Sequence, residues 1–156
     1  MEATVKLEIS DAEWEVMRVV WTLGQVTSHQ VTTILADKMG WKAATSKTLL
    51  GRLVKKGALA TAKEANAFVY TPLVAEQDAM NAATHALFGH LCEMKAGATL
   101  ATLVNDLTLS RTDIAQLQQV LAEKAIDAPA VVPCNCVPIQ LTDGEHGCTP
   151  TAVNND

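Results

Sequence analysis

The sequence predicts a mainly α-helical chain in three parts, and three observations support this fold class. Apolar residues recur every three or four positions through most of residues 9–127, which is the period of a helix. The period changes once, at 58–71, to the alternation typical of a β-hairpin. Four of the five prolines lie beyond residue 126, so little regular structure is expected there. The three parts are predicted at 1–72, 73–127 and 128–156.

Length and composition restrict the class of protein. A chain of 156 residues with 49% apolar residues can bury a core, and it has no apolar run long enough to span a membrane. Residues 1–10 lack the apolar segment of a signal peptide, so a cytoplasmic protein is expected. The sequence contains no Gly-rich phosphate loop, nucleophile elbow or HExxH pattern, so it is not expected to be an enzyme.

The charges are divided unevenly between the two halves of the chain, whose net charge is −5. Residues 1–72 hold nine Lys/Arg and seven Asp/Glu, a net charge of +2, whereas residues 73–156 hold three and ten, a net charge of −7. Only the first part is therefore expected to meet a polyanion.

Three short helices are predicted in the first part, at 9–23, 27–38 and 44–56. Ser10 with Glu13 forms a capping box at the start of the first helix, and Thr27 with Gln30 repeats it at the second. Gly24 and Gly57 follow the first and third helices as stop signals. Short helices with brief connections match a helix-turn-helix arrangement.

The third helix has one apolar face and one polar face. Ser46, Leu49, Leu50, Leu53 and Val54 are predicted to face the core. The opposite face begins with small polar side chains and ends in cations, the order that suits base edges and then phosphates in a major groove. Between 38 and 63 there are seven basic residues and no acidic one. A solvated amphipathic helix with cations near its C-terminus is an equally good interpretation of this helix alone.

A hairpin is predicted after the third helix, with strands at 58–62 and 67–71 joined by residues 63–66. Phe68 and Tyr70 alternate with Val69 and Thr71, and Pro72 closes the second strand. Three helices followed by a hairpin form a winged helix-turn-helix domain.

Residues 9–74 resemble the penicillinase-repressor (BlaI/MecI/CopY) family of winged-helix repressors. The matching stretches are ISDAEWEVMRVVW, VTS, GWKAATSKTLLGRLVKKGAL and FVYTPLV. The resemblance implies a homodimer that binds double-stranded, pseudo-palindromic operator DNA. Ala43 and Ala44 depart from the polar or Pro residues often found there in relatives, which affects the bases recognised. The resemblance and the outward face of the third helix together predict the residues that contact DNA. These are Lys42, Ala44, Thr45, Lys47, Thr48, Arg52, Lys55 and Lys56.

Residues 73–127 contain helical stripes that need a partner surface. One helix is predicted at 76–94, a second after Gly97, and a third capped by Ser110 with Asp113. Their apolar faces either meet in a dimer or pack on the chain's own winged helix, and the family resemblance favours a helical dimerisation domain. Leu87, Leu91, Leu117 and Leu121 are predicted to lie in the subunit contact or in the core that supports it.

The last part, 128–156, is predicted to be a flexible metal-binding tail. Cys134-x-Cys136 and His146-x-Cys148 place thiols and an imidazole at spacings that suit Cu(I) or Zn(II). CNCVPIQ resembles the first of two C-x-C pairs in the copper-responsive repressor CopY, but Leu141 and Asp143 stand where the second would fall. Two unpaired cysteines in a disordered tail are the alternative. Cys92 is expected to be a buried, inert thiol on a helix.

Together these features indicate a copper-responsive transcriptional repressor that is released from its operator when Cu(I) binds the tail. The resemblance implies Zn(II) in the DNA-bound state and Cu(I) in the released state. A copper chaperone that delivers Cu(I) is a further candidate partner. One alternative is a β-lactam-responsive repressor that is inactivated by proteolysis, although a protease switch needs no thiols. Another is a metal-buffering or thiol-redox protein, which would leave the acid-free helix unexplained.

Overall fold

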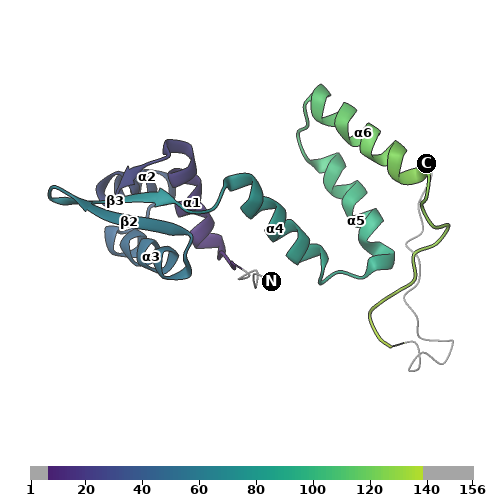
Figure 1. Cartoon of the computed structure of the whole chain (residues 1–156), viewed down its shortest axis with the longest axis horizontal. Helices are drawn as coiled ribbons and strands as arrows, with labels where there is room; N and C mark the ends of the chain where they lie inside the picture. Colours follow the sequence, from purple (N-terminus) through teal and green to yellow (C-terminus); the bar gives the residue numbers. More distant parts are fainter. Residues whose placement is uncertain (1–6, 139–156) are drawn as a thin grey trace. The chain divides into compact units, whose positions relative to one another are not determined.

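A computed structural model of the chain describes residues 7–138, and residues 1–6 and 139–156 lie outside this description (Figure 1). The chain divides into two compact units, Met1–Ala86 and Leu87–Asp156. The first unit includes the segment that leads into the fourth helix and most of that helix, because Ala79 is buried there and the Trp21 indole donates to the Val74 carbonyl at 2.9 Å.

The first unit is a winged helix-turn-helix domain, so the predicted fold class is confirmed. Its helices and strands follow the predicted order, with one additional short strand between the first two helices. They are α1 (Asp11–Leu23), β1 (Val26–Thr27), α2 (Ser28–Met39), α3 (Ala43–Lys56), β2 (Leu59–Glu64), β3 (Ala67–Pro72) and the greater part of α4 (Glu76–Phe88).

Both predicted capping boxes are present. At the start of α1 the Ser10 hydroxyl accepts from the Glu13 amide at 3.3 Å, and the Glu13 carboxylate accepts from the Ser10 amide at 3.0 Å. Thr27 and Gln30 make the equivalent pair of bonds at α2. Gly57 ends α3 with φ 82°, a left-handed conformation that costs glycine least.

The three strands form one antiparallel sheet in the order β1-β3-β2. The hairpin runs from Leu59 opposite Pro72 to Glu64 opposite Ala67, so its loop is shorter than predicted. The loop contains only Ala65 and Asn66, and Ala65 has φ 53°. Strand β1 was not predicted, because two residues are too short to show an alternation and its position depends on pairing with β3.

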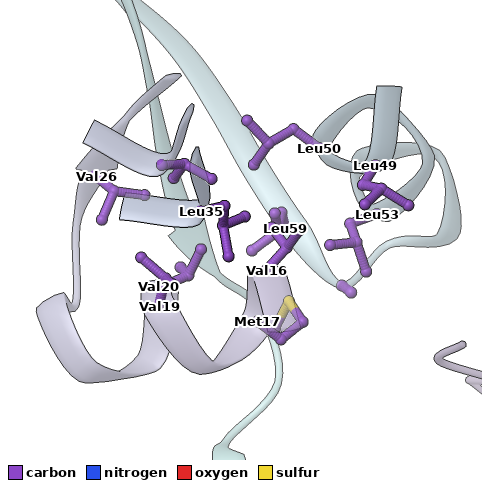
Figure 2. Packing of buried hydrophobic residues seen from close by; sticks show 12 residues of the cluster. Val16, Met17, Val19, Val20, Val26, Leu35, Leu49, Leu50, Leu53 and Leu59 are labelled. Carbon is purple, nitrogen blue, oxygen red and sulfur yellow. The ribbon is translucent and has the colours of Figure 1, made fainter. Parts of the chain in front are cut away.

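The core of this unit lies between the three helices and the sheet (Figure 2). Leu50 and Leu53 of α3 face side chains from α1, α2 and β2 in the same cluster. This packing sets the rotation of α3 about its own axis, because burying these leucines leaves the opposite face of the helix outside. The fully buried residues of the cluster include Val16, Met17, Val20, Val31, Leu35, Leu50, Leu53 and Leu59.

The second unit contains α5 (Glu93–Asp106) and α6 (Arg111–Ala125). The single helix predicted at 76–94 was wrong, because α4 ends at Phe88 and α5 begins at Glu93. Gly97 lies inside α5 and does not precede it. The predicted cap of α6 is confirmed, since the Ser110 hydroxyl accepts from the Asp113 amide at 3.1 Å. Within residues 7–138, no helix combines the length and the apolar character needed to cross a bilayer.

Candidate functional site

The outward face of α3 carries the residues that the sequence predicts for DNA contact. Ser46, Leu49, Leu50 and Leu53 are buried and Val54 is half-buried, so the predicted inward face of the helix is confirmed. The opposite face is open to solvent. All eight predicted DNA-contacting residues are exposed, namely Lys42, Ala44, Thr45, Lys47, Thr48, Arg52, Lys55 and Lys56.

Two threonines on this face differ in their hydrogen bonds. A shallow depression of about 340 Å³ runs along α3 and is lined by Ala44, Thr45, Thr48, Leu49 and Arg52. The Thr48 hydroxyl donates to the Ala44 carbonyl at 2.9 Å, so its proton is already used within the helix. The Thr45 hydroxyl makes no hydrogen bond to any part of the chain that the structure describes, so it can both donate and accept at a base edge.

The cations around α3 fall into two groups. Lys56 Nζ lies 2.6 Å from Glu13 Oε2 and 2.8 Å from the Glu8 carbonyl oxygen, and Lys38 Nζ lies 2.6 Å from Glu15 Oε2. These two ammonium groups therefore hold α3 and α2 to α1. The others form no ion pair with the described residues, and they are Lys42, Lys47, Arg52, Lys55 and Lys63.

Glu13 connects the start of α1 with the end of α3. The residue is 2% exposed, and its carboxylate accepts from both Lys56 and the Ser10 amide. Burial opposes ionisation of this carboxyl, but the hydrogen bonds from Lys56 and Ser10 and the charge of Lys56 outweigh it, so the pKa of Glu13 lies below its ordinary value. Lys56 thus has a structural partner that sequence reasoning missed, and DNA contact by Lys56 stays a prediction.

The second unit contains a group of three thiols. Sγ atoms of Cys92, Cys134 and Cys136 all lie within 4.8 Å of one another, and the Cys92 and Cys134 sulfurs are 3.8 Å apart. Cys92 and Cys134 are half-buried and Cys136 is exposed. The structure therefore brings two of the predicted ligands together with Cys92, a cysteine that was not among the predicted ligands. The other two, His146 and Cys148, lie outside the described residues.

The expectation that Cys92 is a buried thiol within a helix was wrong. Cys92 is the N-cap residue of α5, and it is half-buried beside Cys134. The error came from extending the preceding helix to residue 94, past its true end at Phe88. Gly89, directly after Phe88, was the available stop signal. No local pattern, however, pairs Cys92 with a residue 42 positions away.

The sulfur spacing fits one soft metal ion. Thiolates bind such ions at about 2.3 Å, which places neighbouring sulfurs about 4.0 Å apart in a trigonal site and about 3.8 Å apart in a tetrahedral one. The three sulfurs here lie within 4.8 Å of one another, so small movements bring all three to bonding distance. Thiolate ligands select Cu(I), Zn(II) and iron–sulfur clusters over hard cations such as Mg²⁺.

The sequence is similar to known repressor proteins. A family model described as "Penicillinase repressor" matches residues 9–123. The chain is 56% identical over 131 residues to the uncharacterized 16.5 kDa protein of the ptsI 3' region of Latilactobacillus sakei, covering 84% of this chain and 90% of that protein. It is 34% identical over 116 residues to the penicillinase repressor of Bacillus licheniformis, and the match covers 74% of this chain and 91% of that protein.

Solved structures include two repressor chains that are similar to this one. The DNA-binding domain of the repressor BlaI shares 44% identity with a TM-score of 0.44, and the match covers 46% of this chain and 88% of that one. A CopR repressor structure shares 48% identity with a TM-score of 0.38, and this match covers 43% of this chain and 97% of that one.

Proposed function

This chain belongs to the penicillinase-repressor family of transcriptional repressors, and we propose that it is a copper-responsive member that binds operator DNA as a homodimer and leaves it when Cu(I) binds its cysteines. The observation that supports copper sensing most directly is the group of three thiols at the start of α5. A repressor inactivated by proteolysis has no need for such a group, so the β-lactam-responsive alternative leaves it unexplained.

DNA binding is assigned to the exposed face of α3. Thr45, Lys47 and Thr48 approach base edges near the start of the helix, and Arg52 and Lys55 bind phosphates near its end. Two winged helices related by a two-fold axis recognise the two halves of a pseudo-palindromic operator. Thr45 is the better candidate for direct recognition of a base, because the Thr48 hydroxyl donates to the Ala44 carbonyl.

Dimerisation is assigned to the second unit, because α5 and α6 contain no buried residue within the single chain. Leu103 is 41% exposed, Leu117 is 37% exposed and Leu121 is 59% exposed. Two short helices with apolar stripes left open to water gain too little from burial to offset the entropy of ordering them. A second copy of the same unit supplies the missing apolar surface with two-fold symmetry.

The copper response requires a difference in affinity between the two states of the repressor. Cu(I) releases the protein only if it binds the DNA-free form more tightly than the DNA-bound form. Cys134 and Cys136 are the central ligands in this proposal, with Cys148 and His146 contributing. Zn(II), which prefers four ligands in a tetrahedron, occupies the site in the DNA-bound state and depends more strongly on the imidazole of His146.

The test uses operator duplexes selected from random-sequence DNA by the purified dimer. Wild-type protein and a Cys134→Ser, Cys136→Ser double variant are bound to fluorescent duplex without oxygen, and anisotropy is followed as Cu(I) is added. Both proteins are expected to bind, and only the wild type is expected to dissociate. Dissociation of the double variant at the same Cu(I) concentration would place the sensor elsewhere in the chain. If Cu(I) leaves the wild type bound, the copper response itself is wrong.

A further inference from the structure

We infer that Cys92 is the third thiolate ligand of the metal site, so that each protomer holds Cu(I) between the N-cap residue of its α5 helix and its own C-x-C pair. The inference rests on the proposed function in one respect, the identity of the metal. It adds a ligand at the N-terminus of α5, whereas the other two cysteines lie in the segment that follows α6.

The geometry of the three sulfurs supports this assignment. Cys92 Sγ is 3.8 Å from Cys134 Sγ, close to the separation of about 4.0 Å expected for two thiolates of a trigonal site. Cys136 completes a group in which all sulfurs lie within 4.8 Å. Neighbours in a C-x-C pair are close because of their sequence spacing, but Cys92 is 42 residues from Cys134 and is brought there only by the fold.

A second contact holds the C-x-C segment against α5. Cys92 makes no side-chain cap at the start of the helix, and the Asn135 side-chain oxygen accepts from the Glu93 amide at 3.0 Å instead. The residue between the two cysteines thus satisfies one of the amides left open at the N-terminus of α5. The Cys136 amide also donates to Cys134 Sγ at 3.4 Å. These bonds orient the sulfurs before a metal arrives, as outer-shell groups do in other metal sites.

The three thiolates of this site are by themselves sufficient for Cu(I). Cu(I) is satisfied by two or three thiolates, whereas Zn(II) requires a fourth ligand. In the described part of the chain, the group consists of Cys92, Cys134 and Cys136 with no histidine or carboxylate among them. A Cu(I) ion bound by three thiolates carries a net negative charge. The N-terminus of α5, which is the positive end of the helix dipole, stabilises that charge. Metal binding at Cys92 therefore acts directly on a helix that carries an exposed apolar stripe.

The experiment compares Cys92→Ser with Cys92→Ala in full-length protein. Both variants lose the thiol, but serine is a preferred N-cap residue and alanine is not, so the pair separates ligation from helix capping. All proteins carry Cys148→Ser, which prevents the fourth cysteine from replacing a lost ligand. Cu(I) affinity is measured without oxygen by competition with a chromogenic Cu(I) chelator, and X-ray absorption gives the number of sulfur ligands.

The parent protein is expected to show three sulfurs, and both Cys92 variants are expected to show two. Because loss of an outer-shell group alone weakens metal binding about 10–100-fold, loss of this ligand is expected to weaken it by about 100-fold or more. Asn135→Ala should keep three sulfurs and weaken binding about tenfold, whereas Asn105→Ala, the same change at the other end of α5, should have no effect.

The outcomes separate this inference from the proposed function. Unchanged sulfur number and affinity in Cys92→Ser would overturn the role of Cys92, even if Cu(I) still released the wild type from DNA. Weaker binding in Cys92→Ala together with wild-type binding in Cys92→Ser would also overturn it, because capping alone would then explain the effect. Another outcome is that the parent protein shows three sulfurs and the Cys92 variants two, while Cu(I) fails to release the wild type from DNA. This result would confirm Cys92 as a ligand and refute the copper response.

Discussion

The ion pair between Glu13 and Lys56 is expected to stabilise the winged-helix domain by joining the start of α1 to the end of α3. We consider Glu13→Gln and Lys56→Met, alone and combined. Glutamine at position 13 retains an acceptor for the Ser10 amide, so the capping box survives and only the charge is removed. Lys56 also donates to the Glu8 carbonyl at 2.8 Å, so it keeps one partner when Glu13 is neutral.

The magnitude follows from the unequal burial of the two side chains. The Glu13 side chain is 3% exposed and the Lys56 side chain is 37% exposed. Removing one partner from a fully buried pair costs about 3–5 kcal/mol, whereas exposed pairs contribute about 1 kcal/mol or less. Because the ammonium group remains partly hydrated, we expect a coupling free energy of about 1.5 kcal/mol between the two positions, with each single variant destabilised by about 1–2 kcal/mol.

Urea unfolding followed by tryptophan fluorescence measures this coupling selectively. All three tryptophans, Trp14, Trp21 and Trp41, lie in the first unit, so the signal reports the domain that contains the ion pair. Protein concentration is kept equal across the four proteins, because the proposed dimerisation would make apparent stability concentration-dependent. A coupling free energy below about 0.3 kcal/mol, the scatter of independent sites, would refute the reasoning.

The same pair gives the domain a defined acid sensitivity. The pKa of Glu13 is lowered from 4.5 in the folded protein, so its contribution is fully present above pH 4.5 and is lost as the pH falls through the lower, folded value. The urea midpoint of the wild type should therefore fall with decreasing pH in that window more steeply than that of Glu13→Gln. Parallel pH profiles for the two proteins would contradict the assignment.

Four further changes test other parts of the structure. Arg52→Ala should weaken binding to all DNA sequences alike and lower the salt dependence by about one phosphate contact; altered base preference with an unchanged salt slope would contradict this role. Leu117→Lys with Leu121→Lys should abolish the dimer, and sedimentation that shows an intact dimer would exclude this contact. Ser46→Ala should raise the free energy of unfolding by about 1 kcal/mol, because the buried Ser46 hydroxyl has no partner in the described structure; a lower urea midpoint would show that it has one. Gly51→Ala should add about 0.8–1 kcal/mol of helix stability, since an added methyl group meets nothing within 4 Å, and operator affinity measured in parallel shows how closely DNA approaches α3.

Local sequence determined the elements whose signals lie within a few residues. Ser10 with Glu13 and Thr27 with Gln30 mark helix starts because each capping box closes over only three positions. The face of α3 was equally predictable, since a stripe of leucines specifies the rotation of a helix once any core is available. These features were sufficient to identify the winged helix-turn-helix and the candidate DNA-contacting residues. They did not specify what those residues contact within the chain.

Only the tertiary structure decided the contacts between distant segments. Strand β1 exists because β3 offers Val69 and Tyr70 as partners, and its two residues have no periodicity of their own. Lys56 was predicted to contact DNA, but its ammonium group forms an ion pair with Glu13, which is 43 positions away in the sequence. The packing of α1 against α3 brings these two residues together. Cys92 joins Cys134 for a similar reason, across 42 positions. Local patterns record the conformational preferences of neighbouring residues, whereas these pairings depend on which surfaces are buried against each other when the whole chain folds.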